Sequence, residues 1–411
     1  MNQKLLNLCI NANHASKTLI SSSGDLRNMA LSVIADNLIK NTEYILQENQ
    51  KDIINAKESG LRESMIDRLQ LNSARINAIS NSIKKIIALP DPLGNGEVFV
   101  RPNGLKIQKV HVPMGTIGII YEARPNVTAD AASLCIKSGN SVILKGGKEA
   151  IYSNVAIGNI LRDSIEQCGL DKNCINIIED TSRETTIKLM KMRGYIDVLI
   201  PRGSKNLIRS VTENATVPVI ETGAGNCHIY VDKSADLDKA LNIVINAKMS
   251  RPSVCNAAEK LLVHENIAKL FLPMIKSNMP NVEIRGCELT RQIIECNIAS
   301  EEDWETEYND YIISVKVVSS TYEAVEHINK YNTKHSESII TSTLFDAEYF
   351  QKNIDAAAVY VNASTRFTDG EEFGLGSEIG ISTQKLHARG PMGLNELTTV
   401  KYLINGDGQI R

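Results

Sequence analysis

The chain has 411 residues, more than a single hydrophobic core usually holds, and this length predicts two large domains. Hydrophobic residues make up 43% and charged residues 23%, as in an ordinary folded protein, while aromatic residues make up only 5%, so the core must be aliphatic. The 45 basic and 48 acidic residues give a net charge of −3 without a long basic block, so we expect no nucleic acid as a partner.

Composition also argues against a membrane or a metal. No apolar run approaches the roughly 20 residues of a membrane span, and the first residues turn polar before an apolar signal segment can form. The eight cysteines show no Cys-x-x-Cys spacing, and the seven histidines form no His-x-x-x-His pair. We therefore expect a cytoplasmic protein with reduced thiols and no metal site.

Residues 2–89 show helical periodicity, with apolar side chains at spacings of three and four. Prolines at 90 and 92 end this region because proline lacks the backbone donor and clashes with the preceding turn. Two strands joined by a turn are expected next, at 97–100 and 105–110. Such a hairpin exposes a strand edge, so pairing with another subunit is expected.

From residue 115 onward, strands and helices alternate. Short Val- and Ile-rich runs separated by helices predict a parallel sheet covered on both faces, which is typical of nucleotide-binding proteins. The expected strands are 117–121, 141–145, 175–178, 198–201 and 217–222, and the expected helices are 126–137, 149–168, 183–192 and 205–213.

A second alternating block follows a helix expected at 236–247, so the fold class is α/β with two Rossmann-like domains. Its expected strands are 261–263, 282–284, 313–318, 338–343 and 358–362, and its expected helices are 267–279, 321–331 and 346–355. A glycine-rich tract at 369–393 and a last strand at 398–404 complete the chain.

Three glycine-containing turns follow strands of the first block. Glycine there lets the backbone approach a phosphate, with helix N-terminal amides pointing at the anion. One such turn alone is weak support, since a strand-end glycine often only satisfies a turn. Three in one sheet indicate a nucleotide site, with two lysines that could meet a ribose or a 2′-phosphate. The turns are Lys145-Gly146-Gly147-Lys148, Arg202-Gly203-Ser204-Lys205 and Thr222-Gly223-Ala224-Gly225.

Cys255 stands in a short polar turn, Arg251-Pro252-Ser253-Val254-Cys255-Asn256. A thiol acts as a nucleophile in its thiolate form, which nearby positive charge favours, and Lys248 and Arg251 lie just upstream. Cysteine is also among the most buried residue types, so packing is the ordinary expectation for any one cysteine. Glu221 lies 34 residues before Cys255 (255 − 221), on a strand-end loop.

Glu-x-Gly followed 34 residues later by a cysteine, with strand-end Lys145 and Gly203-Ser204 before it, resembles the aldehyde dehydrogenase superfamily. Further tracts are similar to the branch that reduces an acyl phosphate, and the resemblance covers essentially the whole chain. These tracts are Tyr121–Asn126, Glu221–His228, Arg251–Ala257, Tyr360–Gly370 and Ser382–Gly393.

The resemblance implies an NADPH-dependent reduction of L-glutamyl 5-phosphate to L-glutamate 5-semialdehyde and phosphate, the second step of proline biosynthesis from glutamate. Cys255 would displace phosphate to give a thioester, and hydride would reduce the thioester to a thiohemiacetal that releases the aldehyde. The Cys255 backbone N–H and the Asn126 side chain would stabilise the oxyanion. NADP would be bound by Lys145, Gly146, Lys148, Gly203, Ser204, Gly223 and Glu307.

Two acidic residues keep alternative roles. Glu221 matches the base that activates water in hydrolytic aldehyde dehydrogenases, yet a reductase must keep water from its thioester. We expect Glu221 to handle a proton or to order the nicotinamide end, with loop capping as the structural alternative. Glu307 matches a ribose-binding glutamate of the superfamily, in a degraded motif, and the alternative is a solvated acid.

Substrate anions call for cationic or amide donors. His387 could bind phosphate, although a lone histidine is more often structural. The candidates in family-typical tracts are Arg124, Arg366, Lys385, His387 and Arg389.

The resemblance also implies a domain plan: a cofactor-binding domain over 1–234 with segments 358–396 returning to it, a catalytic domain over 235–357, and a small β oligomerisation element formed by 97–112 and 397–411. A homo-oligomer and a transient contact with glutamate 5-kinase are expected. One rival interpretation is an aldehyde dehydrogenase that oxidises a related semialdehyde, with Glu221 as base. Another is a catalytically silent scaffold, against which Cys255 and the glycine turns argue.

Overall fold

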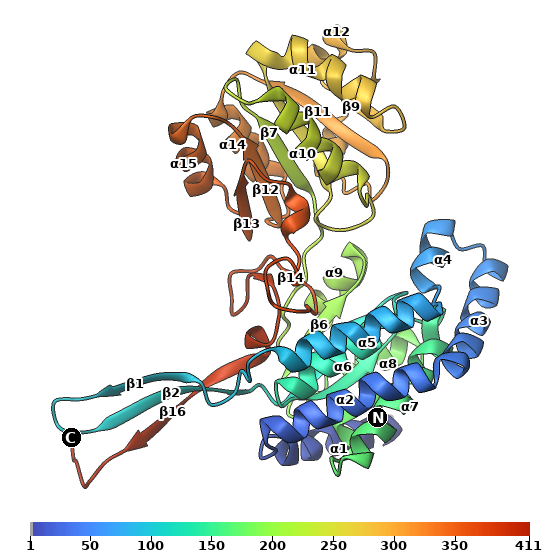
Figure 1. Ribbon diagram of the computed structural model, residues 1–411, viewed down its shortest axis with the longest axis vertical. Coiled ribbons are helices and arrows are strands. Elements are labelled where there is room, and N and C mark those ends of the chain that lie inside the picture. Colours follow the sequence, from blue (N-terminus) through green and yellow to red (C-terminus); the bar gives the residue numbers. More distant parts are fainter. Residues whose placement is uncertain (1–2) are drawn as a thin grey trace. The chain divides into compact units, whose positions relative to one another are not determined.

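The computed structural model describes residues 3–411, which form two α/β units (Figure 1). The first unit contains the chain up to Glu221 together with Gly374–Gly380 and Met392–Arg411. The second contains Thr222–Phe373 and Ile381–Pro391. These boundaries differ from the expected ones at 234 and 357, because strands on both sides of the expected catalytic domain pair into the second unit's own sheet.

The amino-terminal part of the first unit is helical, as predicted. Ser23 and Asn72 cap two of the helices, and each side-chain oxygen accepts a hydrogen bond from the first turn. The last helix ends just before Pro90, as expected. The helices are α1 (Gln3–Leu19), α2 (Gly24–Lys40), α3 (Thr42–Glu58), α4 (Glu63–Leu69) and α5 (Ser73–Ala88).

A four-stranded parallel sheet forms the centre of the first unit, in the order β5-β4-β3-β6. Buried side chains of α1, α8 and α9 pack against it in one apolar cluster, and α6 and α7 also contact it. The elements are β3 (Thr116–Tyr121), α6 (Pro125–Lys137), β4 (Ser141–Lys145), α7 (Ile151–Gln167), β5 (Ile175–Ile177), α8 (Arg183–Leu189), β6 (Val198–Arg202) and α9 (Lys205–Asn214).

The prediction of a regular strand at 217–222 is wrong. The segment forms only isolated bridges, one of them between Val219 and Leu199. Pro218 lies in the middle of it and has no N–H to donate to a ladder.

The second unit has a seven-stranded parallel sheet in the order β10-β9-β11-β8-β7-β12-β13. The central strand β7 was missed by the sequence analysis, which placed its first residues in a glycine-rich motif. The strands are β7 (Cys227–Val231), β8 (Ala258–His264), β9 (Glu283–Gly286), β10 (Asn297–Ile298), β11 (Ile312–Val318), β12 (Ser336–Ile340) and β13 (Ala358–Val361). The helices are α10 (Leu237–Met249), α11 (Glu265–Asn278), α12 (Glu288–Ile293), α13 (Glu301–Glu305), α14 (Thr321–Tyr331) and α15 (Leu344–Asn353).

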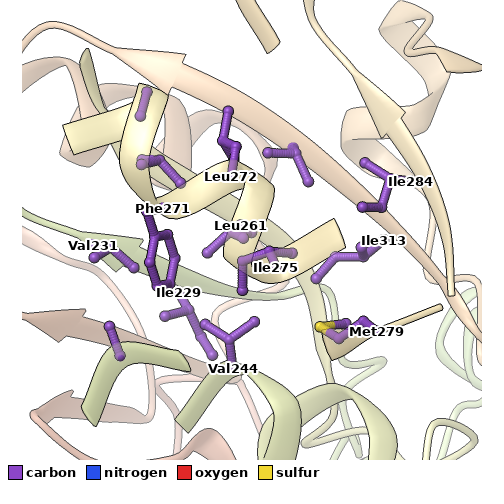
Figure 2. Close-up of a cluster of buried hydrophobic side chains, with 14 of the residues drawn as sticks. Ile229, Val231, Val244, Leu261, Phe271, Leu272, Ile275, Met279, Ile284 and Ile313 are labelled. Carbon is purple, nitrogen blue, oxygen red and sulfur yellow. The ribbon is translucent and has the colours of Figure 1, made fainter. Parts of the chain in front are cut away.

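Side-chain alternation along the strands gives this sheet two buried faces. Ile229 and Leu261 belong to a cluster with Phe271 and Leu272 of α11 (Figure 2). The intervening Tyr230 packs in a different cluster with α14 and α15. Both faces of the sheet are therefore covered, as expected for a parallel sheet, although β8, β9 and β12 each carry charged residues within their bounds.

A three-stranded antiparallel sheet in the first unit joins β1 (Gly96–Val100), β2 (Lys106–Pro113) and β16 (Thr398–Asn405) in that order. This sheet, which we call the arm, includes the predicted hairpin and the predicted last strand. Phe99, Ile107 and Ile404 pair across it and form one apolar row. Most of its side chains are exposed, and Ile404 exposes 58% of its surface.

Across the described residues 3–411, no helix combines the length and apolarity needed to cross a membrane.

Candidate active site

Cys255 lies in the turn between α10 and β8, half-buried, in the second unit. A buried ion pair closes the base of this turn: Lys248 Nζ lies 3.0 Å from Glu259 Oε2, and both side chains are 0% exposed. Burial raises the pKa of Glu259 to about 7 and lowers the pKa of Lys248. Lys248 is therefore bound to Glu259, whereas the sequence suggested it as a cation for the thiol.

The glycine turn before β7 meets the cysteine turn. A side chain on Gly225 would place its Cβ 1.5 Å from the Cys255 carbonyl oxygen, so only glycine fits there. The same carbonyl oxygen accepts a hydrogen bond from Cys227 Sγ at 3.2 Å. Gly225 N–H donates to Glu307 Oε1 at 2.8 Å, so Glu307 reaches this turn and is not a solvated acid. Backbone contact thus brings together the glycine turn at Gly225 and the turn that carries Cys255.

Asn256, directly after the cysteine, is a buried polar residue that the sequence analysis did not single out. Its Nδ2 donates to the carbonyl oxygens of Arg366 at 3.2 Å and Thr368 at 3.0 Å. The sequence signal for it is an amide side chain between Cys255 and two alanines. The contact depends on a segment 110 residues away and cannot be read from local spacing.

Gly223, predicted to contact the cofactor, has a packing reason to be glycine. Its N–H donates to the Ile381 carbonyl oxygen at 2.8 Å, and an added Cβ would lie 2.2 Å from Thr383 Cγ2. Its role toward a cofactor stays a prediction.

The basic tract near the end of the second unit gathers around one carboxylate. Asp355 accepts from Arg389 Nη2 at 2.7 Å and lies 3.0 Å from Lys385 Nζ. The hydrogen bond from Arg389 chiefly lowers the pKa of Asp355, to about 2. His387, which lies between Lys385 and Arg389 in the sequence, is exposed and has a positive φ of 68°.

Lys145 ends β4 in the first unit and is 4% exposed. Its Nζ donates to the Gly146 carbonyl at 3.2 Å, and burial lowers its pKa. A side chain on Gly146 would lie 2.2 Å from Asn154 Nδ2, inside a buried polar network. Lys148 opens the next short turn, η1 (Lys148–Ala150). Two lysines thus flank the end of β4, as the sequence predicted.

The Gly203-Ser204 turn opens α9. Ser204 Oγ accepts from Leu207 N–H at 3.3 Å and caps the helix. Glu122 Oε2 accepts from Ser204 N–H at 2.8 Å, so a carboxylate of the chain itself lies where a phosphate was expected. The turn has the donors for an anion, and a phosphate there would replace Glu122.

Asn126 and Arg124 lie at the start of α6 in the first unit, with Arg124 at the N-cap position. Asn126 is exposed, and its amide donates to Asp130 Oδ2 at 3.0 Å. Glu221 is the last residue of the first unit's long segment. The roles predicted for these three residues stay predictions. In the described part of the chain, no group of three or more metal-ligating side chains could hold a metal ion.

The chain is similar to known proteins over nearly its whole length. The sequence model of the aldehyde dehydrogenase family matches residues 26–292. The γ-glutamyl phosphate reductase of Caldicellulosiruptor bescii is 58% identical over 405 residues, 97% of each chain, and that of Clostridium perfringens strain SM101 is 57% identical over 100% of each chain. The crystal structure of the γ-glutamyl phosphate reductase of Thermotoga maritima matches with a TM-score of 0.96 at 49% identity, covering 99% of each chain.

The chain belongs to the aldehyde dehydrogenase family, which confirms the predicted fold class. A more distant structure, an acetylating aldehyde dehydrogenase of Geobacillus thermoglucosidasius with 16% identity and a TM-score of 0.74, shares that fold. Within the family, identity over nearly the whole length places the chain among the γ-glutamyl phosphate reductases.

Proposed function

We propose that the protein reduces L-glutamyl 5-phosphate to L-glutamate 5-semialdehyde and phosphate with NADPH, in proline biosynthesis from glutamate. The observation that carries the proposal is the contact between the Gly225 turn and the Cys255 turn. It presents a half-buried cysteine on a loop whose base is fixed by a buried ion pair.

In the proposed reaction, the Cys255 thiolate attacks the acyl carbon and the C–O bond to phosphate breaks, which leaves a thioester and inorganic phosphate. When bound, NADPH would supply the hydride for reduction of this thioester. The Cys255 N–H and the Asn126 amide would hold the developing oxyanion, and breaking of the C–S bond then releases the aldehyde and the thiolate. Glu221 would handle a proton or order the coenzyme end of the site.

A nicotinamide coenzyme fits the residues of the first unit. The ends of β4 and β6 offer two lysines and a capped helix N-terminus, which suit the negative charges of a dinucleotide. The preference for NADP over NAD rests mostly on the family resemblance, because Lys145 and Lys148 could each serve the ribose of either coenzyme. We assign coenzyme contacts to Lys145, Gly146, Lys148, Gly203, Ser204, Gly223 and Glu307.

Four basic residues are proposed for the substrate's carboxylate and phosphate: Arg124, Lys385, His387 and Arg389. Lys385 and Arg389 already share Asp355, and their combined charge still exceeds that of its carboxylate. Arg366, expected in the same role, receives a different one below.

We propose further that a second copy of the chain pairs with the arm, whose apolar row and open strand edge are otherwise exposed to water. A cytoplasmic location and a transient contact with glutamate 5-kinase complete the proposal, the latter because an acyl phosphate is short-lived in water.

The reverse reaction tests the function. The purified protein is mixed with glutamate 5-semialdehyde, NADP and phosphate, and NADPH formation is followed with and without phosphate, and again with NAD. We expect turnover that requires phosphate and is faster with NADP. Cys255→Ser is expected to lose on the order of a thousandfold in kcat or more.

Each rival interpretation has its own outcome in that assay. Turnover undiminished without phosphate would show a hydrolytic aldehyde dehydrogenase with Glu221 as base. A folded protein inactive under every condition would be a silent relative.

A further inference from the structure

One side chain closes the loop that carries Cys255. The loop runs from Ser250, at the end of α10, to Asn256. Arg366, in the short turn η3 (Thr365–Phe367), donates from Nε to Ser250 Oγ at 3.1 Å and from Nη1 to Asn256 Oδ1. The guanidinium therefore joins both ends of the loop, an arrangement that we call the Arg366 bridge.

The far end of the Arg366 bridge is itself held in place. Asn256 is 4% exposed. Its Nδ2 donates to two backbone carbonyl oxygens, that of Arg366 within η3 and that of Thr368 just after it. Its backbone carbonyl accepts from Thr365 Oγ1 at 2.7 Å. A buried amide whose donors and acceptor are all satisfied by one segment has a single orientation available. The residue next to the cysteine is thus fixed through its side chain and its backbone.

The Arg366 bridge also places a positive charge on the side chain of Asn256, the residue that follows Cys255. Burial lowers the pKa of Arg366 and Arg251 adds to this lowering, whereas the negative charges of Asp369 and Cys255 raise it. The interaction is reciprocal, so a guanidinium that gains from a Cys255 thiolate favours that thiolate equally. Lys248, which the sequence suggested as a cation for the thiol together with Arg251, is instead bound to Glu259.

We propose that Arg366 is a positioning residue, which holds the Cys255 loop in its reactive conformation and favours the thiolate, rather than a ligand of a substrate anion. This inference rests on the proposed function, because it takes Cys255 as the nucleophile. It replaces the sequence-based expectation that Arg366 binds substrate.

The test compares Arg366→Gln and Arg366→Lys with Arg291→Gln, which removes the same charge from an exposed position of the same unit. Alkylation of Cys255 by iodoacetamide is measured across a pH series by peptide mass spectrometry, alongside kcat and KM in the reverse reaction. For R366Q we expect the alkylation midpoint to rise by about one pH unit and kcat to fall at least about tenfold, with KM for semialdehyde and phosphate within about twofold of wild type.

The other variants separate charge from geometry. R366K keeps the charge but cannot join both loop ends with a planar fork, so we expect a near-normal alkylation profile with a lowered kcat. R291Q is expected to match wild type in every measurement. If R366Q is not recovered folded, Ser250→Ala, which releases one end of the bridge without changing charge, is expected to lower kcat without raising KM.

A substrate-ligand role predicts the opposite pattern for R366Q: KM for semialdehyde or phosphate raised about tenfold or more, with an unchanged alkylation profile. That result overturns the inference, as does a folded R366Q identical to wild type in both measurements. Failure of the proposed function is seen separately, because a fully active Cys255→Ala contradicts the nucleophile, whereas alkylation of Cys255 needs no turnover.

Discussion

At the scale of single residues, the site depends on one contact between two backbones that is too close for a side chain at the glycine position. Gly225 lies against the Cys255 carbonyl, and its N–H is held by Glu307. Glycine is required at this position by close approach of two backbones, since its φ is not among the positive values of this chain. Any larger residue must move one of the two turns.

Gly225→Ala is therefore expected to destabilise the fold by about 1 to 3 kcal/mol and to lower kcat by on the order of a hundredfold, because the added Cβ displaces the nucleophile's backbone. Urea unfolding and the phosphate-dependent assay check this. A folded G225A with wild-type kcat would contradict the close contact between the turns.

The candidate site could be predicted from sequence as far as motifs reach. Cys255, the glycine turns and the two lysines at the end of β4 can be recognised from residue type and from their positions near strands. Asn256 and Arg366 could not be assigned in the same way, because their roles arise from hydrogen bonds between segments 110 residues apart. Lys248 was misassigned since its partner Glu259 is recognised only when the turn is closed.

At the scale of elements, a row of polar residues crosses the second unit's sheet. Glu337, His228, Lys260, Ser314 and Arg285 are paired neighbours on five adjacent strands. His228 Nδ1 lies 3.0 Å from Glu337 Oε2, and both side chains are 0% exposed. Burial raises the pKa of Glu337 and lowers the pKa of His228, which disfavours the charged form of each side chain.

This row explains why β7 escaped sequence prediction. A buried strand is expected to be continuously apolar, whereas Cys-His-Ile-Tyr-Val carries a histidine that only its neighbours on β12 can satisfy. The strands without such partners, such as 141–145, were predicted with their observed bounds. Whether a polar residue such as His228 fits a buried strand depends on its partners on neighbouring strands, and the local sequence pattern does not contain these partners.

His327 of α14 packs against this row, with its ring centroid 6.0 Å from that of His228, and burial lowers its pKa to about 3. Its usual pKa is near 6.5, so below that pH the unfolded chain takes up a proton that the folded chain does not. The stabilising contribution is complete above pH 6.5 and is lost as the pH falls toward 3.

His327→Gln should therefore make stability less dependent on pH. Between pH 7.5 and pH 5, we expect the wild type to lose on the order of 2 kcal/mol more unfolding free energy than the variant. Urea unfolding at both pH values measures this, with the exposed His14→Gln for comparison. Equal losses in wild type and H327Q would refute the assignment.

At the scale of the whole molecule, the arm offers the surface for self-association. The row of Phe99, Ile107 and Ile404 lies on a thin sheet that contributes little to either core. A charge placed in the row should therefore disturb association more than folding.

Ile404→Lys is expected to shift the protein to a smaller particle in size-exclusion chromatography with light scattering, while its unfolding midpoint at low concentration changes little, because a lysine in a buried apolar interface is strongly disfavoured. Identical particle masses for I404K and wild type would show that the arm is not the interface.

The arm also has a consequence for how the chain is made. Pro113, the last residue of β2, pairs with Thr398, and 285 residues (398 − 113) separate them. At typical rates of synthesis, a ribosome needs roughly 15 to 60 s to bridge that interval, and the unbroken stretch Thr222–Phe373 can fold meanwhile. A nascent chain thus carries β2 with one unpaired edge for most of its synthesis, and an unpaired strand edge is a template on which other chains can pair.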